Sequence, residues 1–121
     1  MIKRKVNRCL FVGWAAVILT LTSIPKLQSP IDDSLNFDKL AHSFVYLVFA
    51  WLFMRMHGSA ADRKTIRKLI LLAVLVPIFD ELHQIPIPGR SFSWWDILAD
   101  MIGFWIIILI YAKKIRNANL N

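Results

Sequence analysis

Four long apolar stretches, separated by short polar segments, make up most of this chain. They cover residues 9–24, 40–56, 66–85 and 94–112, and each approaches the roughly 20 residues that a helix needs to cross a bilayer. Backbone groups in lipid must be paired within their own segment, and the stretches are too long and too continuously apolar for barrel strands. The 121 residues, 57% of them hydrophobic, therefore predict a single all-α domain, a polytopic four-transmembrane-helix bundle.

Basic residues flank these stretches unequally. Twelve of the fifteen lysine and arginine residues precede the first stretch, join the second to the third, or follow the fourth; the other three are Lys26, Lys39 and Arg90. The positive-inside rule predicts that both termini and the middle segment face the cytoplasm. The net charge of +7 is explained by these membrane-flanking clusters, so no nucleic-acid partner is predicted.

The first stretch follows a basic segment, as in a signal peptide. No small-x-small cleavage site comes after it, so we expect residues 9–24 to be a membrane anchor. Cys9 is the one cysteine, which predicts neither an internal disulfide nor a CxxC metal motif.

Ionisable side chains lie near one end of three stretches, on the side opposite the basic clusters. Such groups cost about 2.5–3.5 kcal/mol each inside a membrane span, so they indicate a functional site. Residues four apart share one helix face, which predicts a single cluster in the outer third of the membrane, facing the bundle interior. The pairs at this spacing are Asp38 with His42, Asp80 with Gln84, and Asp96 with Asp100.

Helix capping accounts for only some of these acids. Asp38 and Asp96 begin their helices, where a carboxylate accepts from free N–H groups and suits the helix dipole. Asp100 lies one turn further in, and Asp80 and Glu81 lie at a helix C-terminal end, where the dipole disfavours negative charge. These three need a partner. The candidates are Lys39, His42, Arg90, a bound cation and a proton.

Arg90 follows a segment with two prolines and Gly89, which stiffen the chain and allow a sharp turn. We expect the turn to fold Arg90 back over the acids. Arg90 would then either neutralise the acids and pin the helices, or grip a phosphate or carboxylate of a ligand. The first alternative predicts that Arg90→Ala harms the fold more than Arg90→Ala combined with Glu81→Gln.

A metal site is not predicted from these residues, because no HExxH or similar spacing is present. A divalent cation held by the acids is a weaker alternative.

Two five-residue segments resemble each other. Residues 38–42 and 96–100 both read Asp-x-Leu-Ala followed by His or Asp. Two repeated helical hairpins of the same orientation would place these helix starts face to face.

The spaced polar motifs resemble those of the VanZ-like family. The motifs are Asp38-Lys39-x-x-His42-x-x-x-Tyr46, Asp80-Glu81-x-x-Gln84, Pro88-Gly89-Arg90-x-x-Ser93-x-x-Asp96, and then Gly103. The family comprises small bacterial membrane proteins, and its founding member is associated with resistance to the glycopeptide teicoplanin. The resemblance implies a multi-pass protein of the bacterial inner membrane and cell envelope. Asp100 departs from the family pattern, which commonly has Asn there, and adds an acid to the cluster.

Two main functions are compatible with this cluster. The first is a binding site for a lipid headgroup, a lipid-linked cell-wall intermediate or a glycopeptide, with an influence on glycopeptide and lipoglycopeptide susceptibility. The alternative is a membrane-embedded enzyme acting on a lipid-linked, phosphate-containing envelope substrate, with His42, Glu81 or Asp80 as the catalytic group. A purely structural polar knot and a proton path are the remaining readings. The candidate ligand-binding residues are Asp38, Lys39, His42, Tyr46, Asp80, Glu81, Gln84, Arg90, Ser93, Asp96 and Asp100.

Overall fold

The computed structural model describes residues 2–25 and 35–121, the side chains of residues 35–38 excepted. The described chain forms four α-helices and one short 3-10 turn, without strands. The elements are α1 (Ile2–Ser23), α2 (Leu35–His57), η1 (Gly58–Ala60), α3 (Arg63–Gln84) and α4 (Trp94–Ala118). The all-α prediction is confirmed. The helices extend beyond the apolar stretches at several ends, because the flanking basic residues are also good helix formers.

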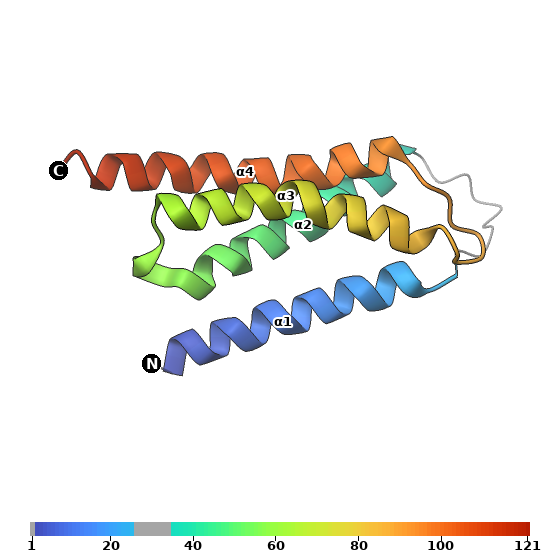
Figure 1. Cartoon of the computed structure of the whole chain (residues 1–121), viewed down its shortest axis with the longest axis horizontal. Coiled ribbons are helices and arrows are strands. Elements are labelled where there is room, and N and C mark those ends of the chain that lie inside the picture. Colours follow the sequence, from blue (N-terminus) through green and yellow to red (C-terminus); the bar gives the residue numbers. More distant parts are fainter. Residues whose placement is uncertain (1, 26–34) are drawn as a thin grey trace.

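Successive helices alternate in direction, so α2 and α4 run the same way (Figure 1). The start of α1, the end of α4 and η1 lie at one end of the molecule, which we call the terminal end. The end of α1, the start of α2 and the segment between α3 and α4 lie at the other, which we call the site end. This arrangement places the predicted cluster residues at a single end of the bundle.

Three of the four helices are long and apolar enough to cross a membrane: α1, α2 from Lys39 onward, and α4. The apolar part of α3 is shorter, because Arg67 and Lys68 interrupt it near one end and Asp80 and Glu81 near the other. The fourth span therefore remains a prediction from the sequence.

The core lies between α2, α3 and α4. Tyr46 and Phe49 of α2 pack against the ring of Phe104 from α4, at centroid distances of 5.7 and 5.6 Å. Gly103 brings α2 and α4 into backbone contact, since a Cβ atom there would lie 2.2 Å from the carbonyl oxygen of Ser43. Small residues at such positions let membrane helices approach closely. This close approach sets the distance between the two helices at the site end.

α1 packs mainly along α2 and adds Ile18 to the buried core. The indole Nε1 of Trp14 donates to the carbonyl oxygen of Val45 at 3.0 Å, a contact that fixes the position of α1 along α2.

The start of α3 is capped by Asp62, whose Oδ1 accepts from the backbone N–H of Thr65 at 2.9 Å and from the Thr65 hydroxyl at 3.0 Å. These hydrogen bonds favour the ionised carboxylate and lower the pKa of Asp62 below its usual 3.8.

Candidate functional site

The starts of α2 and α4 face each other and are joined by three side chains of α2. Lys39 Nζ pairs with Asp96 Oδ1, His42 Nδ1 lies 2.8 Å from Asp100 Oδ1, and the Ser43 hydroxyl donates to the carbonyl oxygen of Ala99 at 2.7 Å. Residues 38–42 and 96–100 thus meet as the sequence echo predicts. The repeat of two hairpins itself remains a prediction.

The two acids of α3 bind different helices. Tyr46 of α2 donates its hydroxyl to Asp80 Oδ2 at 2.8 Å, and Gln84 Nε2 lies 3.4 Å from the same oxygen. Glu81 Oε2 instead accepts from the backbone N–H of Ser93 at 2.9 Å. Asp80, Glu81 and Gln84 are all buried, so the cluster lies inside the bundle.

Ser93 is the N-cap of α4, and its hydroxyl accepts from the backbone N–H of Asp96 at 3.3 Å. Glu81 therefore lies beside the N-terminus of α4. A negative charge there is stabilised by the dipole of α4. The neighbouring helix thus offsets the unfavourable position of Glu81 at the C-terminal end of its own helix, which sequence reasoning does not anticipate.

Two carboxylate oxygens of the cluster lack a hydrogen-bond partner within the described part of the chain. They are Glu81 Oε1 and Asp100 Oδ2, and both residues are 0% exposed. Buried polar atoms in proteins are paired in the great majority of cases. These two oxygens therefore need a donor, which a protonated carboxyl, water or a ligand can supply.

Arg90 does not lie where the sequence predicts. A turn precedes it, in which Arg90 N–H donates to Ile87 O at 3.1 Å and Gly89 has a φ of 76°. Pro88 and Gly89 occupy the central positions, as type II turns favour. The guanidinium then donates to Leu21 O at 3.0 Å and Ile24 O at 3.2 Å at the end of α1.

The expectation that Arg90 covers the acids is therefore wrong. The last carbonyls of a helix have no partner within that helix and attract cations. In the part of the chain that the structure describes, Lys39 and His42 are the basic residues that reach the acids.

Asp38 is a candidate ligand residue whose side chain lies outside the described residues. Among residues 2–25 and 39–121, no group of three or more His, Cys, Asp or Glu side chains could hold a metal ion.

A small cavity of about 160 Å³ adjoins the cluster between α1, α2 and α3. His42, Tyr46 and Asp80 line it together with Thr22 of α1. Sequence reasoning misses Thr22, because one threonine near the end of an apolar stretch carries no distinctive pattern. The cavity gives the polar cluster room for a small group.

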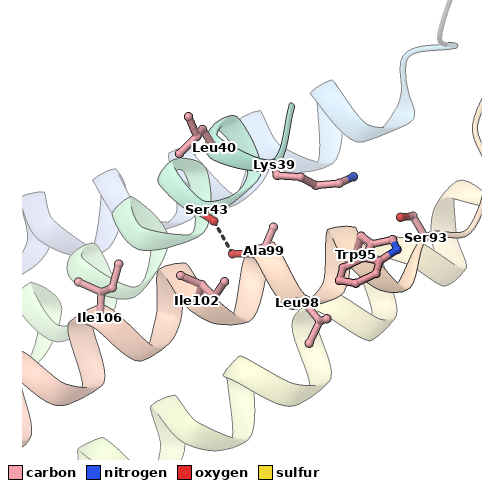
Figure 2. Close-up of a pocket in the computed structure, with 9 residues that line it drawn as sticks. All are labelled: Lys39, Leu40, Ser43, Ser93, Trp95, Leu98, Ala99, Ile102 and Ile106. Atoms are coloured by element: carbon pink, nitrogen blue, oxygen red, sulfur yellow. Dashed lines mark hydrogen bonds between the residues drawn. The ribbon is translucent and has the colours of Figure 1, made fainter. Parts of the chain in front are cut away.

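A larger groove of about 790 Å³ runs along α2 and α4 on another side of the cluster (Figure 2). Lys39 and Ser93 lie toward one end of the groove, and Ile102 and Ile106 toward the other. The hydrogen bond from Ser43 to Ala99 spans the two helices between these ends. The lining residues are Lys39, Leu40, Ser43, Ser93, Trp95, Leu98, Ala99, Ile102 and Ile106.

The helices and the buried cluster define a helical membrane protein with ionisable groups inside its bundle. The chain belongs to the VanZ/LLP1 family, whose sequence model matches residues 4–116. The match covers nearly the whole chain and confirms the resemblance seen in its polar motifs. No curated protein and no solved structure matches the chain.

Proposed function

We propose that the cluster binds the polar head of a membrane lipid, a lipid-linked cell-wall intermediate or a glycopeptide. The observation that carries this proposal is that Glu81 Oε1 and Asp100 Oδ2 are buried and have no hydrogen-bond partner among the described residues. Among the residues whose side chains the structure describes, four acids face one lysine and one histidine here, so the site favours a head that donates hydrogen bonds. Hydroxyl groups of a sugar and ammonium groups meet this requirement, whereas a bare phosphate does not.

The groove between α2 and α4 supports an amphiphilic ligand. Its apolar part, around Leu98, Ile102 and Ile106, suits an acyl or polyprenyl chain, and its polar end reaches Lys39 and Ser93. Lys39 lines the groove and pairs with Asp96 of the cluster. An acyl or polyprenyl chain in the groove would therefore bring the polar head attached to it to the edge of the cluster.

We also propose that α3 spans the membrane and that both termini face the cytoplasm, which turns the site end outward. The unequal distribution of basic residues supports this orientation. The outward face of α3 supports the fourth span, because its side chains are apolar and exposed. They are Leu71, Val74, Leu75, Ile78, Phe79 and Leu82.

Cysteine labelling tests this topology in a Cys9→Ser background. An impermeant reagent added to intact cells should modify Phe92→Cys but not Ser59→Cys. A cysteine at Gln28, outside the described residues, should behave like Phe92→Cys. Modification of Ser59→Cys from outside would refute the orientation.

A membrane-embedded enzyme is the second candidate, favoured by the contact between His42 and Asp100. A carboxylate that orients a histidine is a common arrangement for general-base catalysis. The position of Arg90 weakens this candidate, because the residue expected to hold a substrate phosphate lies against the end of α1.

Lipid analysis of the purified protein tests the binding function. Mass spectrometry should find a co-purifying lipid or lipid-linked intermediate, which Glu81→Gln and Asp100→Asn should deplete while the protein remains folded. Asp62→Asn removes an acid at the terminal end and serves as the matched control. Equal lipid content in all variants would refute the proposal, and a chemically altered lipid would favour the enzyme.

Expression in a glycopeptide-susceptible bacterium tests whether the protein influences glycopeptide susceptibility. Teicoplanin susceptibility should fall with the wild-type chain and return with Glu81→Gln. Unchanged susceptibility with a well-expressed wild-type chain would exclude glycopeptides while leaving the lipid-binding test independent.

A further inference from the structure

The terminal end of the bundle carries a second cavity system, far from the cluster. The start of α3 and the end of α4 lie side by side there (Figure 1). Two cavities of about 530 and 320 Å³ lie between them and share Arg63, Arg67 and Ile115 as lining residues. We call the two together the arginine groove.

Three arginines from two helices line this groove. Arg63 and Arg67 are four residues apart and so share one face of α3, and Arg116 comes from the last turns of α4. Ion pairs to acids are absent for all three within the described residues. Each guanidinium therefore has donors available for a ligand, in the fork geometry that suits phosphate.

One acid, Asp62, lines the groove, and its single negative charge offsets only part of the positive charge of the arginines. Its carboxylate Oδ1 is bound to Thr65 as the cap of α3. Lys64 also lines the groove and adds a positive charge. The groove is therefore strongly cationic, which sets it apart from the acidic cluster at the site end.

One wall of the groove is apolar. Ile66, Ala112 and Ile115 line the groove together with the arginines, near the point where the apolar part of α3 begins and that of α4 ends. Cationic side chains next to apolar walls, at the end of membrane helices, match the two halves of an anionic phospholipid. A free phosphate would use the arginines but gain nothing from the apolar wall.

We propose that the arginine groove binds one anionic membrane phospholipid. Its phosphate lies between Arg63, Arg67 and Arg116, and its acyl chain lies over Ile66, Ala112 and Ile115. The inference is independent of the proposed ligand site, because the two sites lie at opposite ends of the bundle and share no residue, but it rests on the proposal that α3 spans the membrane.

Binding of phosphatidylglycerol to the full chain in a neutral detergent, measured by native mass spectrometry, tests this proposal. The triple variant Arg63→Gln, Arg67→Gln, Arg116→Gln should bind about tenfold more weakly or worse. The control triple variant Lys3→Gln, Lys5→Gln, Arg8→Gln removes the same charge from the same end and should bind within about threefold of wild type. Equal loss in both variants would mean diffuse charge attraction and would overturn the proposal.

A second variant keeps all three arginines and fills the apolar wall. Ala112 is exposed, so Ala112→Trp should fold and should weaken phosphatidylglycerol binding. This variant carries the test if the triple variant fails to fold. Phosphatidylcholine should bind weakly, and millimolar inorganic phosphate should not displace the lipid. Displacement by phosphate, or unchanged lipid binding in Ala112→Trp, would overturn the assignment to a phospholipid.

Discussion

The imidazole Nδ1 of His42 and the carboxylate Oδ1 of Asp100 lie 2.8 Å apart and join α2 to α4 inside the bundle. The other oxygen of Asp100 is buried without a partner in the described chain. An unpaired buried carboxylate oxygen is unfavourable, so we expect the protein to tolerate removal of the charge of Asp100.

Asp100→Asn should therefore fold as well as wild type or better, because an amide can still bond to His42. Asp100→Ala removes that hydrogen bond, so the free energy of unfolding should fall by about 1–3 kcal/mol. Thermal unfolding in detergent distinguishes the two variants. If Asn is as harmful as Ala, the charge itself is needed, and an ionised pair with His42 is the better description.

Tyr46 and Tyr111 are the two tyrosines of the chain, so replacing each of them by Phe gives two variants that can be compared directly. The buried hydroxyl of Tyr46 donates to Asp80, so Tyr46→Phe should destabilise the fold by about 1.5–3 kcal/mol, the range for bonds to charged groups. Tyr111 is half-buried and its ring faces Lys114, so Tyr111→Phe, which keeps the ring, should change stability by less than about 0.5 kcal/mol. Denaturant unfolding of the two variants gives the comparison, and equal effects would contradict a stabilising role for the Tyr46 hydroxyl.

Gly103 and Gly13 differ in the space around them. A Cβ at position 103 would meet backbone atoms of Ser43 and Leu47 at 2.2 and 2.8 Å. Gly103→Ala should thus force α2 and α4 apart and cost about 1–3 kcal/mol or more.

Gly13 has nothing within 4 Å, so Gly13→Ala should be neutral or up to about 1 kcal/mol stabilising through helix propensity. The two alanine variants add the same atoms, and thermal unfolding compares them directly. A harmless Gly103→Ala would mean that the helices do not approach this closely.

Arg90 and Glu81 bind different helices, so their substitutions should be additive. Arg90→Ala removes two bonds to the end of α1, and Glu81→Gln alters the contact to the start of α4. The double variant should equal the sum of the single variants within about 0.5 kcal/mol. Unfolding measurements on all four proteins give the coupling energy. A double variant more stable than the sum of the two single-variant effects would restore the direct pairing that the sequence predicts.

The cap of α3 should depend on pH. The folded-state pKa of Asp62 is lowered, so its stabilisation is fully present above the ordinary pKa of about 4 and is lost as the pH falls through the folded-state value. The difference in Tm between wild type and Asp62→Asn should shrink between about pH 5 and pH 2.5. A constant difference over this range would argue against a charge contribution.

The sequence predicts most of the helical frame because long apolar runs carry a strong, local signal. Trp94 is the first residue of both the fourth predicted stretch and α4, and the third predicted stretch ends within one residue of the end of α3. The spacing of four residues predicts that His42, Asp80 and Asp100 lie near one another; in the structure His42 contacts Asp100, and His42 and Asp80 line one cavity.

The partners of individual side chains are harder to predict because they depend on which helices are neighbours. Arg90 had two possible partners, the acids of the cluster and the free carbonyl groups at the end of α1, and the sequence does not show which of them it binds. Thr22 and Ser43 reach the site from positions that only the crossing of the helices defines.

The contact of Arg90 with Leu21 and Ile24 links residues 69 and 66 positions apart. A ribosome releases α1 before α2, α3 and α4, and Trp14 can bond to Val45 once α2 has emerged. The carbonyls at the end of α1, however, cannot meet their guanidinium until α3 and the turn after it have been made. The site end of α1 is thus secured only after α3 and the turn that follows it, whereas the middle of α1 can be secured as soon as α2 is made. Synthesis therefore separates the closure of the two halves of one helix.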